Sequence, residues 1–225
     1  MKRKLTIAVD GPAGAGKSSA ARGLARALRY RHIDTGAMYR AAAWGAWKAG
    51  LPLDDAAALL RGVRAQRYEF KETKDGARVF LDGEDVTARL RSPEAGQAAS
   101  QLSVHPAVRR VLVDRQRRLA RGGGVVMEGR DIGTVVLPRA DVKFFLDATP
   151  EERGRRRWRE LRAKGRRASL KKIIDDIRAR DHRDRTRAAS PLRAADDAVV
   201  IDTTGFSLAE VQKILRDWVK RKTHR

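Results

Sequence analysis

An eight-residue glycine-rich segment places the strongest restriction on how this chain folds. Residues 11–18 read Gly-Pro-Ala-Gly-Ala-Gly-Lys-Ser, follow the apolar run Leu5–Val9, and precede a segment with Leu24 and Leu28 at helical spacing. In this order, a strand, a G-x-x-x-x-G-K-[ST] loop and a helix indicate a phosphate-binding loop, because the glycines let backbone N–H groups converge on phosphate oxygens. The segment therefore predicts a nucleotide-triphosphate site at a helix N-terminus of an α/β fold.

The residue types of this loop indicate their roles. We expect Lys17 to reach the β- and γ-phosphates, and Ser18 to hold Mg²⁺, mostly through the nucleotide and water. The triphosphate site as a whole is expected to comprise Gly11, Pro12, Ala13, Gly14, Ala15, Gly16, Lys17, Ser18 and Ser19. No N-K-x-D segment occurs, which disfavours a GTPase and leaves a kinase for a small acceptor.

Short apolar segments separated by helical patterns continue along the chain. Further strands are expected at Ile33 and at residues 125–127, 142–146 and 199–201, and helices over residues 37–49, 54–63 and 92–121. Thr149, Pro150 and Glu152 predict the start of another helix with a capping box, and Ser207 with Glu210 predicts a second capping box. Short buried strands alternating with helices indicate a parallel sheet covered on both faces.

A different pattern interrupts this alternation at roughly residues 64–90. Two stretches, residues 68–71 and 79–82, alternate apolar and polar residues, and the Asp75–Gly76 pair between them is a strong hairpin signal. Asp82–Gly83 marks another turn. We expect a small antiparallel insertion there.

The charge balance favours anionic partners. The 225 residues carry a formal net charge of +22, with 50 Lys+Arg against 28 Asp+Glu. Such a surface suits either nucleic acid or phosphate chemistry, and the charge alone does not decide between them. No run of 18 apolar residues occurs, which excludes a membrane-spanning helix. The cysteine count is zero, and a charged start leads directly into the first strand, so we expect a cytoplasmic protein.

A second set of polar residues suggests an acceptor site. Asp34 or Thr35 can cap the helix that follows, and Tyr39 and Arg40 lie in its first turns, where the helix dipole favours a phosphate. Arg180, Asp184 and Arg187 are spaced i, i+4 and i+7, so they share one face of a helix.

These segments resemble the bacterial-type cytidylate kinases, a family of P-loop nucleoside-monophosphate kinases. The resemblance rests on residues 11–18, 34–40 and 128–136, the last of which reads Glu-Gly-Arg-Asp-Ile-Gly-Thr-Val-Val. Residues 180–185, 190–192 and 202–204 extend it over essentially the whole chain. It implies a three-layer αβα P-loop fold with a five-stranded parallel sheet, a small antiparallel β insert and a helical lid.

The resemblance also implies a set of CMP-binding residues. Arg40, Arg130 and Arg187 would hold the CMP phosphate, with Tyr39 close by. Ser100, Arg109 and Asp131 would read the cytosine edge, while Arg180, Asp184 and Thr35 would line the sugar pocket. Asp131 and Ser100 can accept hydrogen bonds from an exocyclic amino group, so such a pocket would reject UMP, whose carbonyl would leave buried groups unpaired.

The resemblance implies a single kinase domain, residues 1–225, in three parts. The core comprises residues 1–36, 91–148 and 194–225, the monophosphate-binding region with its hairpin residues 37–90, and the lid with its following helix residues 149–193. From 151 to 193 there are 17 basic and 7 acidic residues, and lid arginines of this kind neutralise charge in the transition state. Lys17, Arg130, Arg156 and Arg157 are the candidate catalytic residues.

The expected reaction is in-line transfer of the ATP γ-phosphoryl group to CMP or dCMP with Mg²⁺, and it requires no general base. Two alternatives remain open at this point: a P-loop kinase for another acceptor such as UMP, and a basic nucleic-acid-binding ATPase. ATP and CMP or dCMP are the expected partners, with no specific nucleic acid and no membrane, and a monomer is the expected state.

Overall fold

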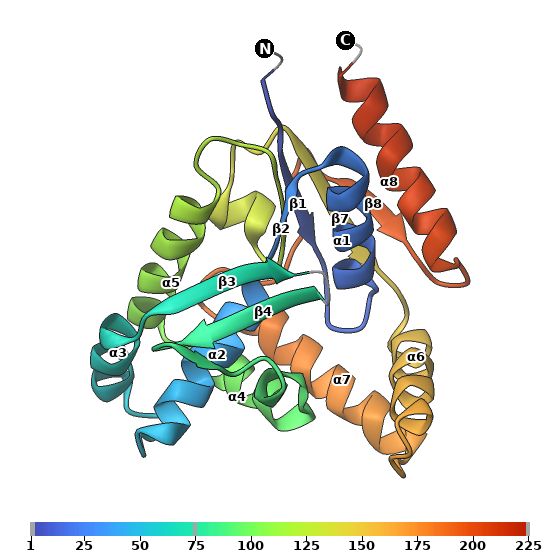
Figure 1. Ribbon diagram of the computed structural model, residues 1–225. Coiled ribbons are helices and arrows are strands. Elements are labelled where there is room, and N and C mark those ends of the chain that lie inside the picture. The colour runs from blue at the N-terminus through green and yellow to red at the C-terminus, as the bar shows by residue number, and fades with distance from the viewer. Residues whose placement is uncertain (1–2, 74–75, 224–225) are drawn as a thin grey trace. The chain divides into compact units, whose positions relative to one another are not determined.

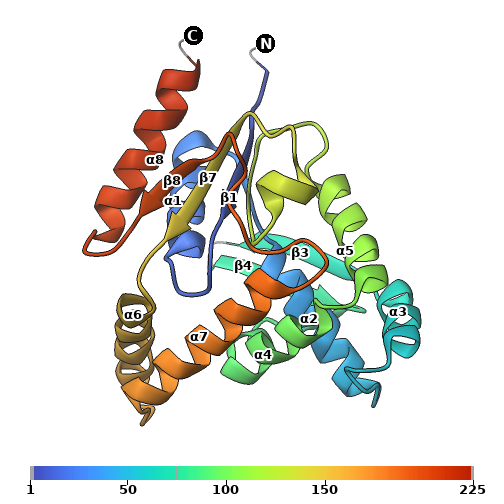
Figure 2. The same ribbon diagram turned by 180° about the vertical axis from the view of Figure 1, so that it is seen from behind.

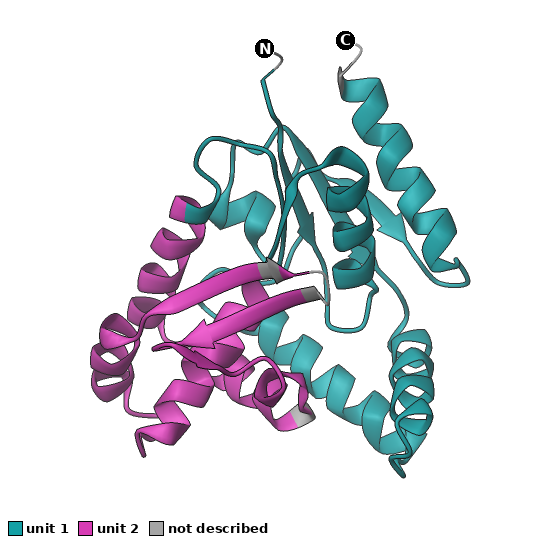
Figure 3. Cartoon of the chain, viewed as in Figure 1, with its two compact units in different colours: residues 1–33, 119–225 teal, residues 34–118 magenta. Residues whose placement is uncertain are grey.

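The computed structural model describes residues 3–73 and 76–223. Packing divides the chain into two compact units, which Figure 3 colours separately. Unit 1 comprises residues 1–33 and 119–225, and unit 2 comprises residues 34–118. No helix among the described residues has the length and apolar character needed to cross a membrane.

Unit 1 is built around a five-stranded sheet with the strand order β2-β6-β1-β7-β8. Its strands are β1 (Thr6–Asp10), β2 (Arg31–Asp34), β6 (Val125–Glu128), β7 (Val142–Asp147) and β8 (Val199–Asp202). The central strand β1 pairs in parallel with two neighbours, in a register that places Ile7 opposite both Val126 and Val142. The P-loop α/β fold class expected from the sequence, with its five-stranded parallel sheet, is confirmed.

Two helices cover one face of this sheet. α1 (Lys17–Leu28) and α8 (Leu208–Thr223) pack side by side, as both ribbon views show (Figures 1 and 2). Leu24 of α1 and Leu215 of α8 are buried with Ile7 and Phe144 of the strands in one apolar cluster. This core fixes β1 and α1, and so fixes the loop that joins them.

Two more helices of unit 1 pack against each other. α6 (Pro150–Ala163) follows β7, and α7 (Leu170–Thr186) follows α6. Gly154 lies where they touch, since a Cβ built there would come within 2.4 Å of Ile174. A short π-helical turn, η2 (Ile132–Val136), follows β6 and has no signal in the sequence analysis.

The capping predictions have mixed outcomes. At α8 the box closes in both directions, because Glu210 N donates to Ser207 Oγ and Ser207 N to Glu210 Oε2. At α6, Thr149 Oγ accepts from Glu152 N at 3.2 Å, as predicted. The prediction of a reciprocal bond from Thr149 N to the Glu152 carboxylate is wrong. The Glu152 carboxylate accepts from Arg156, and Thr149 N donates to Thr204 Oγ instead.

Over residues 34–73 and 76–118, unit 2 contains four α-helices, a 3₁₀ turn and a small antiparallel sheet. The helices are α2 (Thr35–Lys48), α3 (Ala56–Ala65), α4 (Pro93–Leu102) and α5 (Pro106–Leu119), with η1 (Arg89–Arg91) before α4. The sheet contains β3 (Tyr68–Thr73), β4 (Gly76–Leu81) and β5 (Glu84–Asp85) in that order. The antiparallel insertion is therefore confirmed, although the predicted turn at Asp75–Gly76 lies partly outside the described residues.

Two features of unit 2 depend on backbone chemistry. Asp82 and Gly83 both have positive φ (50° and 87°), as a two-residue hairpin turn between β4 and β5 requires. The helical segment expected over 92–121 is divided into two helices, with a break between Leu102 and Pro106. Pro106 has no N–H to donate and disfavours helical backbone at His105, so a new helix begins there.

Candidate active site

The loop between β1 and α1 has a backbone that only glycine suits at its first position. Gly11 has a φ of 142°, and a Cβ built on it would lie 1.9 Å from the carbonyl oxygen of Leu146. Gly16, with a φ of 84°, precedes α1, and no side chain caps this helix. The first-turn N–H groups of α1 therefore remain available to an anion, as at other phosphate-binding helix termini.

Lys17 is the buried cation of this loop. Its ammonium donates to the carbonyl oxygen of Pro12 at 2.6 Å. The pKa of Lys17 is lowered to about 7, chiefly by burial and then by the nearby charge of Arg130, while the charge of Glu128 partly opposes both. An anion bound in the loop would favour the charged form, because an opposite charge within a few ångströms raises the pKa of an ammonium.

The hydroxyl of Ser18 belongs to a chain of polar contacts. Ser18 Oγ donates to Glu128 Oε2 at 2.7 Å, and His32 Nε2 lies 2.9 Å from Glu128 Oε1. Oxygen donors such as the hydroxyl of Ser18 and the carboxylate of Glu128 suit a hard cation such as Mg²⁺. The described residues contain no cluster of three acidic, histidine or cysteine side chains that could hold a metal. The residues thus fit a cation whose other ligands come from a nucleotide and water.

Asp10 is a site residue that the sequence analysis missed. Its two carboxylate oxygens accept from the backbone N–H groups of Ile132 and Gly133, at 2.8 and 2.7 Å. The pKa of Asp10 is raised to about 6, because the effect of burial exceeds the lowering by those two hydrogen bonds. By holding the start of η2, this carboxylate fixes the segment that carries Arg130 and Asp131 beyond the carboxyl end of β6. In the sequence, the one indication of a role for Asp10 was that a charged residue directly follows the first predicted strand.

Three arginines surround the buried carboxylate of Asp184. Arg130 Nε donates to Asp184 Oδ2 at 3.0 Å, and Arg180 Nε lies 3.9 Å from the same oxygen. Burial acts to raise the pKa of Asp184, but the charges of Arg130, Arg180 and Arg187 lower it below its ordinary value. Arg187 ends α7 and donates from Nε to the carbonyl oxygen of Ser190. Asp131, close to Arg130 along the chain, is buried.

Unit 2 holds the remaining residues expected at the acceptor side. Asp34 is the N-cap of α2, since it accepts from Ala37 N at 2.9 Å, and its other oxygen accepts from Arg40. Thr35 is buried in the first turn of α2. The guanidinium of Arg109, on α5, lies over the ring of Tyr39 at 5.5 Å. Ser100 on α4 and Arg109 are both buried, as polar groups that line a binding site often are.

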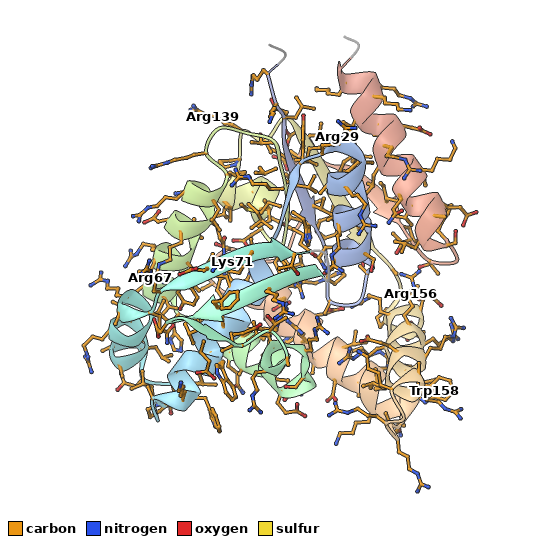
Figure 4. The ribbon with its side chains drawn as sticks, viewed as in Figure 1. Arg29, Arg67, Lys71, Arg139, Arg156 and Trp158 are labelled. Atoms are coloured by element: carbon orange, nitrogen blue, oxygen red, sulfur yellow. The ribbon has the colours of Figure 1, made fainter. Side chains whose placement is uncertain are left out.

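The arginines of α6 differ in their surroundings. Arg156 donates to Glu152 and, with two nitrogens, to the hydroxyl and carbonyl oxygens of Thr203. Its Nη1 would lie 3.9 Å from a Cβ built at Gly16, so its guanidinium stands beside the phosphate loop. Arg157 instead pairs with Glu160 on the exposed side of the helix. In Figure 4, Arg156 lies on the part of α6 nearer the sheet of unit 1, and Trp158 lies further from it.

Arg153 is a further residue that the sequence analysis did not single out. It is 1% exposed and donates to Ala13 O of the phosphate loop, to Ala148 O, and to both carboxylate oxygens of Asp181. Its position among several arginines gave no reason to distinguish it, because burial and partner choice depend on how α6 and α7 pack.

A phosphate loop with a buried lysine, followed on α6 by an arginine beside the loop, defines a P-loop phosphotransferase. The chain belongs to the cytidylate kinase family: the model described as cytidylate kinase matches residues 7–221. It is 51% identical over 210 residues to the cytidylate kinase of Pelotomaculum thermopropionicum, covering 93% of each chain. It is 49% identical over 211 residues to that of Desulfitobacterium hafniense, covering 94% of this chain and 90% of the relative.

A solved structure supports the fold alone. An uncharacterized protein from Eubacterium ventriosum superposes with a TM-score of 0.51 at 12% identity, covering 96% of this chain and 99% of that chain. At this identity the likeness concerns the arrangement of the backbone and not the chemistry.

Proposed function

We propose that this protein transfers the γ-phosphoryl group of ATP to CMP and dCMP, which yields ADP with CDP or dCDP. Its membership of the cytidylate kinase family is the observation that carries this proposal. Ser100, Arg109 and Asp131, to which the resemblance assigns the cytosine edge, support it because all three are buried.

The donor side of the proposed site is the loop between β1 and α1. Residues 11–19 would surround the triphosphate with backbone N–H groups, and Lys17 would neutralise the β- and γ-phosphates. Ser18 would hold Mg²⁺ together with the nucleotide and water. When bound, this ion would supply positive charge that neutralises the charge developing on the phosphate oxygens.

The acceptor-side residues are assigned from the family resemblance. We assign the CMP phosphate to Arg40, Arg130 and Arg187 with Tyr39, and the cytosine edge to Ser100, Arg109 and Asp131. The sugar is assigned to Thr35, Arg180 and Asp184. In this assignment residues 37–90 form the monophosphate-binding region and residues 149–193 form the lid with its following helix.

The reaction needs alignment and positive charge more than covalent help from the protein. A phosphate oxygen of CMP forms a bond to the γ-phosphorus of ATP, and the bond from that phosphorus to the β,γ-bridging oxygen breaks, so that ADP leaves with the electron pair. Lys17, Arg130 and the lid arginines Arg156 and Arg157 are the proposed stabilisers of the transferring group. A phosphate oxygen is already anionic, so no side chain is assigned as a general base.

Selection of cytosine follows from hydrogen-bond matching. The exocyclic amino group of cytosine donates, and the carboxylate of Asp131 and hydroxyl of Ser100 accept. Uracil presents a carbonyl oxygen at that position, which cannot donate a hydrogen bond to these acceptors. A site that depends on such a hydrogen bond can reject the mismatched base by as much as 10⁴-fold, roughly.

An acceptor panel tests the proposal. ADP release is measured with CMP, dCMP, UMP and AMP at fixed ATP and Mg²⁺, and we expect CMP and dCMP to exceed the others in kcat/KM. Higher kcat/KM for UMP or AMP would contradict the assignment of Ser100, Arg109 and Asp131. The net charge of +22 warrants an arm with RNA in place of CMP, and ATP turnover stimulated by RNA alone would favour a nucleic-acid-dependent ATPase.

The cysteine-free sequence suits a reducing compartment, so we place the activity in the cytoplasm. We also propose that the protein works as a monomer with no membrane and no specific nucleic acid as partner. Sedimentation at micromolar concentration would test the monomer directly.

A further inference from the structure

Among the described residues of unit 1, Arg153 is the charged residue with the lowest exposure. Only 1% of its surface is exposed, and its guanidinium makes four hydrogen bonds, two of them with a carboxylate. Nε donates to Ala148 O at 2.8 Å, and Nη1 donates to Ala13 O at 3.0 Å and to Asp181 Oδ1 at 3.1 Å. Nη2 donates to Asp181 Oδ2. An unpaired buried charge would be very costly, so this planar group holds all its partners at once.

The partners of Arg153 come from parts of unit 1 that are far apart in sequence. Ala13 belongs to the phosphate loop, and Gly14 packs on the Arg153 side chain, whose Cβ would lie 3.2 Å from a Cβ built at Gly14. Asp181 lies on α7 and is buried. Arg153 itself lies on α6, so one side chain connects the loop to both lid helices.

The same helix carries the acceptor-side carboxylate. Asp181 and Asp184 are three residues apart on α7, which places them on adjoining turns of one face. Asp184 accepts from Arg130 Nε at 3.0 Å. A continuous series of contacts therefore runs within unit 1 from the carbonyl oxygen of Ala13 through Arg153, Asp181 and α7 to Asp184 and Arg130.

We propose that the Arg153–Asp181 ion pair couples the two substrate sites, so that a triphosphate bound in the loop tightens the binding of CMP and CMP tightens the binding of the triphosphate. The proposal rests on the proposed function. In this proposal both are positioning residues, because the guanidinium of Arg153 is engaged by Ala148, Ala13 and Asp181. A triphosphate fixes the loop and with it the carbonyl oxygen of Ala13. Because the guanidinium is rigid and fully engaged, fixing one partner restricts Asp181, and with it the turn of α7 that presents Asp184 to Arg130.

A purely structural role makes a different prediction. An ion pair that only stabilises the fold would, when altered, change the unfolding midpoint and leave the mutual effect of the two ligands unchanged. Coupling requires that the affinity of each ligand depend on the presence of the other, and the factor must be the same in both directions. This ratio of dissociation constants is therefore the quantity to measure.

The experiment measures the Kd of CMP by calorimetry with and without saturating AMP-PCP, a non-hydrolysable ATP analogue, in the presence of Mg²⁺. Three forms are compared: the unaltered protein, Asp181→Asn, and Glu151→Gln as the matched control. Asp181→Asn keeps the size of the side chain and one acceptor oxygen. Glu151 pairs with Arg178 between the same two helices, but on the exposed side and without contact to the phosphate loop.

We expect AMP-PCP to tighten CMP binding at least about fivefold in the unaltered protein and in Glu151→Gln, within the usual range for coupled sites. In Asp181→Asn the factor should fall below about twofold, while CMP alone still binds. An unchanged factor in Asp181→Asn, or no coupling in the unaltered protein, would overturn the inference. Failure of the unaltered protein to bind CMP would instead overturn the proposed function.

A second measurement covers the case in which Asp181→Asn does not fold. Hydrogen exchange of the α7 backbone amides at residues 180–184 is recorded on the unaltered protein with and without AMP-PCP and Mg²⁺, in the absence of CMP. The coupling predicts slower exchange of these amides when the triphosphate analogue is bound. Equal exchange rates in the two samples would contradict it.

Discussion

The hydroxyl of Ser18 donates to Oε2 of Glu128 over 2.7 Å, which joins the first turn of α1 to the end of β6. The other oxygen of the same carboxylate lies 2.9 Å from Nε2 of His32, and both side chains are almost wholly buried. Glu128 therefore fixes the direction in which Ser18 presents its oxygen lone pairs.

Glu128→Gln is expected to raise the Mg²⁺ concentration needed for half-maximal activity. An amide can still accept a hydrogen bond, but it removes the charge that holds Ser18 Oγ and His32 together. Loss of such an orienting group costs about 10- to 100-fold in metal affinity. The measurement is the initial rate against free Mg²⁺ at fixed ATP and CMP. A higher KM for CMP with an unchanged Mg²⁺ requirement would contradict this role.

Arg130→Ala is expected to damage the use of CMP and spare that of ATP. The change removes a proposed phosphate ligand and leaves the buried Asp184 without its 3.0 Å partner. Truncating one member of such a pair typically corresponds to a loss on the order of 100-fold in affinity. Initial rates at varied CMP and varied ATP separate the two effects. Arg139→Ala makes the same charge change on an exposed turn before β7, and its CMP kinetics should remain normal (Figure 4).

Arg156→Ala is expected to have a larger effect than Arg157→Ala. Arg156 makes three hydrogen bonds and stands beside Gly16, whereas Arg157 makes an exposed pair with Glu160. Removing a preorganised donor at a transferring phosphate costs about 10²-fold or more in turnover, while an exposed pair contributes little. Steady-state rates at saturating CMP and varied ATP measure both. Equal losses in the two variants would show that closure of the lid brings Arg157 into the site.

Asp10 predicts a specific dependence of stability on pH. Its folded-state pKa of about 6 lies above the ordinary 3.8, so the folded protein holds this proton more tightly than the unfolded chain. The resulting stabilisation is fully present below about pH 4 and is lost as the pH rises through 6. A pKa difference of this size corresponds to about 3 kcal/mol.

Denaturant unfolding between pH 4 and pH 7 measures this contribution as the difference between the unaltered protein and Asp10→Asn. The amide does not titrate, so the unfolding free energy of Asp10→Asn relative to the unaltered protein should rise over that range. Asp217→Asn serves as the control, because Asp217 pairs with Lys213 on a helix surface. Parallel pH profiles for Asp10→Asn and the unaltered protein would contradict the assignment.

Local patterns in the sequence predicted much of the fold. The strand starting at Thr6, the phosphate loop and α1 follow from apolar runs and glycine spacing, because these features act within a few residues. The division of the 92–121 segment into α4 and α5 could have been found in Pro106, whose missing N–H is a local breaker. The turn before β5 had a local signal in Asp82–Gly83. The π-helical turn after Asp131 had none, since the N–H groups of Ile132 and Gly133 donate to the distant carboxylate of Asp10.

The residues of the candidate site likewise fall into those that the sequence predicted and those that only the structure revealed. Residue types that bind phosphate, such as Lys17 and Arg130, are recognisable in the sequence through motif and family resemblance. Asp10 and Arg153 were missed, because each acts through partners more than 100 residues away, at Ile132 and Ala13. Arg156 and Arg157 were indistinguishable in the sequence, and only their contacts separate them.

The sequence by itself determined that this protein has a triphosphate loop on a parallel α/β sheet, because glycine freedom, strand periodicity and motif spacing are properties of short segments. The family was indicated by the resemblance of several segments to the cytidylate kinases. Tertiary structure alone decided which charges are buried and which partners they hold. The exclusion of water from Lys17, Asp10 and Arg153 depends on the packing of the sheet with α1, α6 and α7. Burial sets the pKa of Lys17 and Asp10, and it makes the pairing of Arg153 obligatory.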